Sequence, residues 1–162
     1  MESTRMTLNK KCLAALDALY AELPHFVCQG HCQASCGVII MTKPEWLRIT
    51  RKLGYRPKGK PSLVCPMLKH GRCSVHAIRP LVCRLFGLMN ASKMRCPWGC
   101  HPERWLTEEE GYVLLERAEA IAREAFPASE ATAYAHGIVR GEIPAYMAQA
   151  KREGKVHYER VG

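Results

Sequence analysis

The sequence predicts a mainly α fold: a small single domain with an irregular cysteine-rich middle flanked by helices. Three observations predict it. Apolar residues recur at helical spacing near the N-terminus, two capping boxes each precede a helical pattern, and residues 65–100 are dense in cysteine, proline and glycine without a regular period. The 162 residues fit one domain over 1–162, with a cysteine-rich core at 25–106 and a helical part at 107–162.

The N-terminal segment has apolar residues every three or four positions, among them Leu8, Cys12, Leu16 and Leu19, and this pattern ends before Pro24. Such spacing places them on one face of an amphipathic helix. Cys12 lies on that face. Because an unpaired cysteine packs like a small hydrophobic residue, we expect Cys12 to be a buried core thiol rather than a ligand.

A capping box predicts the second helix. Thr42 is followed three positions later by Glu45, so each side chain can satisfy a backbone N–H group at the helix start. We expect this helix to include Trp46 and to end near Gly54.

A second capping box predicts a later helix. Thr107 is followed by three glutamates, and acidic side chains in the first turn favour a helix start. We expect this helix to run to about Phe126, because Pro127 stops it. Two shorter helices are predicted after it, at Ser129–His136 and Ile143–Arg152.

The composition is that of an ordinary globular protein, with 48 % hydrophobic and 24 % charged residues. No apolar stretch approaches the ~18 residues that a membrane helix needs. The N-terminus has no apolar signal-peptide core, so we expect a cytoplasmic location and no membrane contact.

Nine cysteines are the unusual feature, and eight of them fall between positions 28 and 100. A reducing cytosol disfavours structural disulfides, so clustered thiols there more often bind metal. Thiolates select zinc, copper(I) or iron–sulfur clusters, and four serve each zinc ion or cubane. Eight cysteines fit two such sites, and they fit equally a single site with the remaining thiols reduced. The candidate metal ligands are Cys28, Cys32, Cys36, Cys65, Cys73, Cys83, Cys96 and Cys100.

The stretch CPMLKHGRCSVHAIRPLVCRLFG resembles the CxxCxxCC cysteine-cluster family of zinc- or iron-chelating domains. The likeness spans roughly residues 28–100 and includes TKPEW, Leu53-Gly54, Cys65-Pro66, Arg79-Pro80 and Cys83-Arg84. The chain differs in its first half, where three spaced cysteines stand in place of four. The resemblance implies metal binding through these cysteines. Some members belong to a flagellin lysine methylase that looks like an iron–sulfur protein.

An iron–sulfur cluster, with 4Fe-4S as the candidate form, is favoured over zinc. Cys65, Cys73 and Cys83 are too widely spaced for a zinc finger, and a proline follows Cys65 and Cys96, as it follows a cysteine in bacterial ferredoxins. Arg79 and Arg84, on either side of Cys83, are the candidate cofactor-binding residues. Each could donate N–H groups to cluster sulfurs. The histidines near the cysteines are more simply explained as exposed or supporting residues: His31, His70, His76 and His101.

Charge is uneven along the chain. Residues 1–106 have 17 Lys/Arg against 5 Asp/Glu, whereas residues 107–162 have 7 against 10. The excess either balances buried thiolates or marks a surface for an anionic partner. The basic segment Lys43–Lys60, with Trp46 and Tyr55, is the candidate nucleic-acid contact; a protein partner is the other option.

Three functions remain open at this level. The first is an iron–sulfur protein in electron transfer or in support of a macromolecule-modification reaction. The second is a zinc-stabilised module that binds nucleic acid or protein, and the third is a cluster-dependent enzyme acting on a macromolecule. No P-loop, dinucleotide fingerprint, HExxH motif or nucleophile elbow occurs, and the sequence assigns no catalytic residue.

Overall fold

The computed structural model of this chain describes residues 2–30, 39–57, 64–92 and 94–134. In order, the elements are α1 (Glu2–Ala21), β1 (Ile40–Thr42), α2 (Lys43–Leu53), β2 (Leu68–Lys69), β3 (Arg72–Cys73), the 3-10 turn η2 (His76–Ile78), α3 (Leu81–Leu85), α4 (Glu108–Arg123) and β4 (Thr132–Tyr134). The fold is mainly α, as predicted. None of the helices in the described part is long and apolar enough to cross a membrane.

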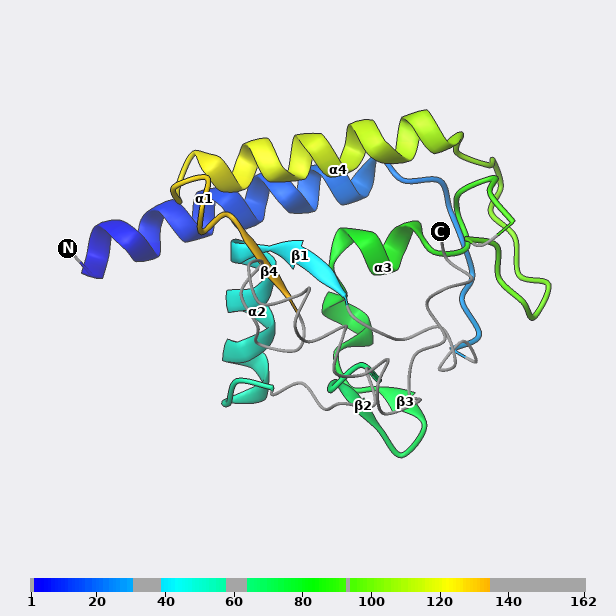
Figure 1. The fold of residues 1–162 in the computed structure, drawn as a ribbon, viewed down its shortest axis with the longest axis horizontal. Helices are drawn as coiled ribbons and strands as arrows, with labels where there is room; N and C mark the ends of the chain where they lie inside the picture. Colours follow the sequence, from blue (N-terminus) through cyan, green and yellow to red (C-terminus); the bar gives the residue numbers. More distant parts are fainter. Residues whose placement is uncertain (1, 31–38, 58–63, 93, 135–162) are drawn as a thin grey trace, which may run out of the picture.

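Helices α1 and α4 form one layer of the molecule, running antiparallel to each other (Figure 1). Their facing side chains and α3 build the first hydrophobic core, which includes Leu16, Leu19, Leu85 and Leu114. Cys12 is 3 % exposed on the same face of α1, and its thiol donates to the carbonyl of Ile121 in α4 at 3.4 Å. The prediction that Cys12 is a core thiol is confirmed.

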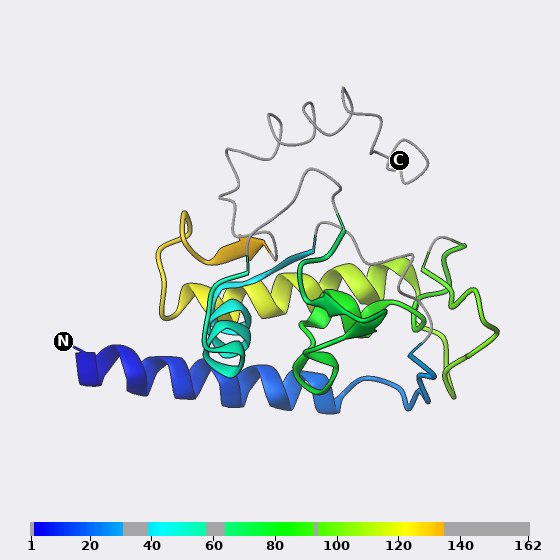
Figure 2. The same ribbon diagram turned by 90° about the horizontal axis from the view of Figure 1, so that it is seen from below.

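The second layer contains α2, the short strands and α3. Figures 1 and 2 show α2 projecting away from α1, with the β2–β3 hairpin beyond α3. A second hydrophobic core joins β1, α2 and the hairpin region, and its buried members are Met41, Trp46, Ile49, Cys65, Met67 and Val75. Trp46 is only 5 % exposed, so its predicted place on a nucleic-acid surface is wrong. Its position three residues before Ile49 puts both side chains on the buried face of α2.

Both capping boxes form as predicted. Thr42 accepts from the amide of Glu45 at the start of α2, and Thr107 accepts from the amide of Glu110 at the start of α4. Helix α2 ends at Gly54, which has φ 76°, a conformation that glycine adopts without strain. Helix α4 ends at Arg123, three residues before the predicted end, and turns lead on to Pro127.

The predicted helix at Ser129–His136 does not form over its described part. Residues Thr132–Tyr134 are strand β4 instead, which pairs antiparallel with β1 so that Ile40 faces Tyr134. Strand pairing satisfies the backbone groups of two segments that are each too short to form a stable helix. The helix predicted at Ile143–Arg152 lies outside the described residues.

Candidate metal centre

Two segments that are distant in sequence meet at one end of the molecule. Residues 24–30, which follow α1, run beside the loop at 96–103, and both views show them side by side (Figures 1 and 2). The amide of Glu103 donates to the carbonyl of His25 at 3.0 Å, and the amide of His25 donates to the carboxylate of Glu103 at 3.0 Å. This pairing places Cys28 next to Cys96 and Cys100.

The three thiols lie close enough to affect the ionisation of Cys100. Besides burial, the thiols of Cys96 and Cys28 both raise the pKa of the Cys100 thiol, and the backbone amide of Gln29 lowers it. The next amide, of Gly30, donates to the Cys28 sulfur at 3.4 Å. Successive backbone N–H groups aimed at one region stabilise anions there, and many iron–sulfur sites use this device. We call Cys28, Cys96 and Cys100 the first cysteine group.

A tight turn sets the spacing of Cys96 and Cys100. The amide of Gly99 donates to the carbonyl of Cys96 at 3.3 Å, and Gly99 has φ 80°, which favours glycine. The surrounding loop is tied to the first core, because the amide of Leu106 donates to the carbonyl of Leu88 at 2.9 Å. The first cysteine group is therefore presented by irregular backbone that is anchored at both ends.

The electrostatics of the first cysteine group oppose full ionisation. Burial raises the pKa of the Cys100 thiol, the neighbouring thiols of Cys96 and Cys28 raise it further, and the amide of Gln29 lowers it. Like charges at close range disfavour a second and third thiolate. A metal cation would remove that repulsion and deprotonate the thiols that it binds.

A second pair of cysteines lies at the base of the β2–β3 hairpin. Cys65 precedes β2 and Cys73 ends β3, where Cys73 pairs with Leu68 in register. The amide of Leu68 donates to the carbonyl of Cys65 at 3.1 Å. The hairpin turn is made by His70 and Gly71, both at positive φ (52° and 72°), as a tight two-residue turn requires. We call Cys65 and Cys73 the hairpin pair.

Cys65 is less accessible than the cysteines of the first group. Its side chain is 7 % exposed and belongs to the second hydrophobic core. Burial raises the pKa of the Cys65 thiol, and the nearby Cys73 raises it further, while the backbone amides of Met67 and Leu68 lower it. Without a cation the Cys65 thiol stays neutral.

The other predicted ligands are placed in part. Cys83 lies half-buried on α3, and its amide donates to the carbonyl of Pro80 at 3.0 Å. Cys32 and Cys36 lie outside the described residues, as does His31. None of the seven described cysteines is in a disulfide. Over the described ranges, no three His, Cys, Asp or Glu side chains stand close enough together to hold a metal ion as they are placed.

The two candidate cofactor-binding arginines lie on either side of Cys83. Arg84 donates to the carbonyls of Arg79 at 2.8 Å and Ala77 at 3.3 Å, and its guanidinium lies 4.4 Å from the ring centre of Tyr20. Arg79 contacts the ring of His76, and its buried Nε has no hydrogen-bond partner among the described residues. The Nε of Arg79 is therefore a free donor among the described residues, while Arg84 is engaged by the backbone; the role of both arginines toward a cofactor stays a prediction.

The described histidines are exposed. His70 occupies the hairpin turn, as predicted, and His101 contacts only the neighbouring carbonyl of Pro102, at 3.4 Å, among the described groups. Burial, followed by the charges of Arg79 and Arg84, lowers the pKa of His76. The exposure of His70, His76 and His101 agrees with the prediction, and their role beside a metal stays a prediction.

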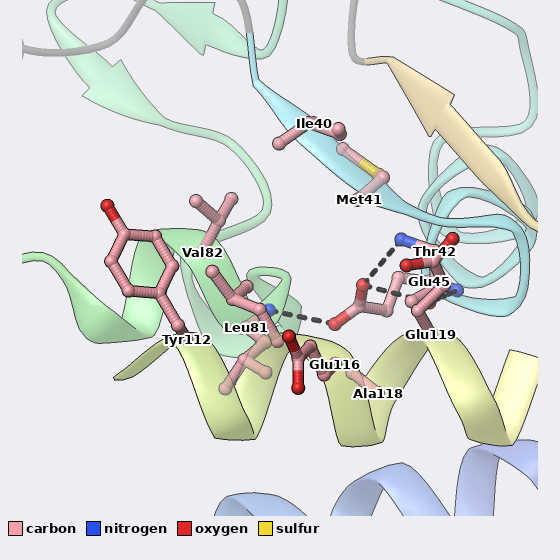
Figure 3. Close-up of a pocket in the computed structure, with 11 residues that line it drawn as sticks. Ile40, Met41, Thr42, Glu45, Leu81, Val82, Tyr112, Glu116, Ala118 and Glu119 are labelled. Carbon is pink, nitrogen blue, oxygen red and sulfur yellow. Dashed lines mark hydrogen bonds between the residues drawn. The ribbon is translucent and has the colours of Figure 1, made fainter. Parts of the chain in front are cut away.

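A buried carboxylate is the feature that the sequence did not reveal. Glu45 is 3 % exposed and borders a groove of about 260 Å³ between β1, α3 and α4 (Figure 3). One of its oxygens accepts from the hydroxyl of Tyr20 and the amide of Leu81 at 2.8 Å; the other accepts from the amide and hydroxyl of Thr42, both at 2.9 Å. With four donors the carboxylate has no strong acceptor position left for a substrate. We assign Glu45 a structural role.

Comparison with protein-family models, with curated proteins and with solved structures gives no match to this chain. The case for a metal centre therefore stands on the cysteines and their surroundings.

Proposed function

We propose that this chain is a cysteine-ligated metal protein whose metal is held as an iron–sulfur cluster, and that it serves electron transfer or supports the modification of a macromolecule. One observation carries the proposal. The first cysteine group draws thiols from segments nearly 70 residues apart, and a backbone amide donates to the Cys28 sulfur. Hydrophobic packing alone gives no reason to gather half-exposed thiols in this way.

The ligand set of the first site needs one more thiolate than the first cysteine group supplies. Cys32 and Cys36 follow Cys28 by four and eight positions. Because each residue of extended chain spans about 3.5 Å, either lies within reach of that group by connectivity. A fourth ligand from this pair would give the all-sulfur set that a cubane or a zinc ion takes. The hairpin pair and Cys83 offer three of the four thiolates that a second site would need.

The chemistry of the donor groups favours a cluster. Amide donors to thiolate sulfur stabilise the reduced, more negative state of an iron–sulfur centre, which raises its reduction potential. The amide of Gly30 supplies such a donor at the first site, and the Nε of Arg79, which has no partner among the described residues, is a further candidate. A cluster bound here would supply one-electron chemistry; the role of these residues is to hold it and to tune its charge.

The partial exposure of the first cysteine group also supports redox use. Cys28, Cys96 and Cys100 are half-buried, and Trp98 between two of them is 61 % exposed. A centre near the surface can exchange electrons with a partner protein. A purely structural zinc site would have no need of this exposure, although it would use the same ligands.

The deciding experiment is metal and acid-labile sulfide per chain, on full-length protein purified without oxygen and without added metal. About four irons with four sulfides per chain, and visible absorption bleached by dithionite, would support one cubane; about eight of each would support two. Colourless protein that holds zinc without sulfide would overturn the cluster and leave the zinc-stabilised binding module. Protein free of both would overturn metal binding.

A further inference from the structure

Exposed basic residues gather on two neighbouring parts of the chain. They come from the last turn of α2, from the residues just after it, and from the tip of the β2–β3 hairpin. In Figure 1 both elements lie on the side of the molecule away from α1 and α4. We call this surface the cationic face; it consists of the exposed residues Arg51, Lys52, Tyr55, Arg56, Lys69 and Arg72.

One contact joins the two parts of the cationic face. The ammonium of Lys69, on the hairpin, lies 4.9 Å from the ring centre of Tyr55, which follows α2. The Tyr55 side chain is 45 % exposed, so the ring is accessible while it carries the lysine. The positive charges of α2 and of the hairpin therefore act together.

Acidic residues do not balance the charges of the cationic face. Within the described residues, none of its arginines or lysines forms an ion pair. Elsewhere the pattern differs: Arg48, Arg104 and Arg117 each pair with a carboxylate. Glu45 is the only acid between positions 43 and 100, and its carboxylate is buried among its four donors. Like charges gathered without counter-charges favour an anionic ligand.

The arrangement also argues against the other explanation, in which the basic residues balance buried thiolates. The side chains of the cationic face are exposed, and charge in water compensates a buried anion poorly because water screens it. Arg79 and Arg84, beside Cys83, are half-buried, so they are better placed to balance the charge of buried thiolates.

We propose that the cationic face binds the phosphate backbone of a nucleic acid. Nucleic-acid interfaces are richer in positive charge than protein interfaces, whose centres are apolar and poor in lysine. The residues that define the cationic face are all cationic except Tyr55, whose half-exposed ring offers a surface on which a base can stack. This inference goes beyond the metal centre, because none of its residues is a candidate ligand.

Fluorescence anisotropy tests the proposal on full-length protein as isolated, with its metal. The probes are a labelled single-stranded RNA of about 20 nucleotides and a DNA of the same sequence, which exceed the usual site size of one small domain. Affinity should fall steeply as salt rises. Each phosphate contact should add about 0.7 to the slope of the logarithm of affinity against the logarithm of salt concentration. The double variant Lys69→Gln with Arg72→Gln should weaken binding about 25-fold at 0.1 M salt, since each lost contact accounts for about fivefold there.

A matched control removes the same charge from another face. Lys10 and Lys11 are exposed on α1, so Lys10→Gln with Lys11→Gln should leave affinity within about twofold, because no phosphate contact is lost. Lys69→Arg with Arg72→Lys should restore binding, because it keeps both charges. Metal content measured on every variant separates a loss of the face from a loss of the fold.

A steep salt dependence that the hairpin variant reduces and the α1 variant does not would support the proposal, and the tighter probe would tell RNA from DNA. No binding to either probe at about 0.05 M salt, or equal losses in the two variants, would overturn it. Binding to vesicles of phosphatidylserine without binding to either probe would also overturn it and assign the face to a membrane surface.

Discussion

The carboxylate of Glu45 accepts a hydrogen bond from the backbone amide of Leu81 at 2.8 Å, which joins α2 to the first turn of α3. The same group accepts from the hydroxyl of Tyr20 on α1 and from two donors of Thr42. Burial, followed by the charge of Glu45, raises the pKa of Tyr20, so its hydroxyl stays protonated and donates. One buried charge thus connects three helices, including the helix that carries Cys83.

Glu45→Gln should therefore destabilise the protein strongly. The amide NH₂ group would face at least one donor, and a buried group without a partner costs about 1–3 kcal/mol, or more where a charge-assisted network is lost. We expect a loss of about 3 kcal/mol in the free energy of unfolding, measured in urea. Glu116→Gln, exposed beside the same groove, is the control and should change stability by less than about 0.5 kcal/mol. Equal effects would contradict the structural role.

The two capping threonines should differ in importance. Thr107 is exposed and caps α4 alone, so Thr107→Ala should cost about 1 kcal/mol. Thr42 is buried, and its hydroxyl also donates to Glu45 at 2.9 Å, so Thr42→Ala should cost about 2 kcal/mol. Urea unfolding of the two variants checks the order; a larger loss for Thr107→Ala would contradict the network.

Two exposed carboxylates should contribute to acid sensitivity. The amide of Thr107, then Arg104, lowers the pKa of Glu110 below its ordinary 4.5, and a hydrogen bond from Arg117 lowers the pKa of Glu22. The unfolded chain then binds these protons more readily than the folded one. Their stabilisation is present above pH 4.5 and is lost as pH falls through the folded pKa values.

The variant Glu22→Gln with Glu110→Gln isolates this effect. Its melting temperature, followed by circular dichroism, should lie below that of the unmodified chain at neutral pH, and the two should converge as pH falls below 4.5. Curves that stay parallel through this range would show that neither carboxylate is linked to folding.

Local signals predicted the local parts of this fold. Both capping boxes form within four residues, so Thr42 and Thr107 marked the starts of α2 and α4 without knowledge of the rest. Strand β4 could not be predicted in this way, because it pairs with a strand about 90 residues earlier in the chain. Tertiary pairing of this kind overrides weak local helix propensity.

The same limit applies to the candidate site. The sequence supplied a pool of eight thiols, but only the fold brings Cys28 beside Cys96 and Cys100. Glu45 suggested only a helix cap, whereas Tyr20 and Leu81, its other partners, lie 25 and 36 residues away. The sequence held one signal for this role: Glu45 is the single acid in a long basic segment. A carboxylate in such a place either faces solvent or is buried with hydrogen-bond donors around it.

Gly87 offers a test of how the first cysteine group is positioned. It has φ 90°, and a Cβ there would stand 2.8 Å from the ring of Phe26, two residues before Cys28. Gly87→Ala should push that ring away and lower both stability and metal content. Gly54 has φ 76° but open space around it, so Gly54→Ala should cost only about 1 kcal/mol of strain and leave metal content unchanged.

Unfolding in urea and metal analysis of the two glycine variants separate strain from displacement. We expect Gly87→Ala to lose about 2 kcal/mol more than Gly54→Ala, because overpacking adds to the backbone strain. If both variants keep full metal, the segment that carries Cys28 does not contribute to the site.

Substitution of Cys100 by serine tests whether this cysteine is a metal ligand, and substitution of the core cysteine Cys12 is the comparison. Cys100→Ser should lose the metal of the first site, because a hydroxyl is a far harder and less acidic ligand than a thiol. Cys12→Ala is the matched control: its thiol is buried against Ile121, so metal content should stay constant while stability falls by about 1 kcal/mol. Metal lost from Cys12→Ala, or retained by Cys100→Ser, would reverse the assignment. A chelator should lower the melting temperature of the unmodified protein and leave that of Cys100→Ser almost unchanged. The reason is that only a bound metal adds its binding free energy to folding.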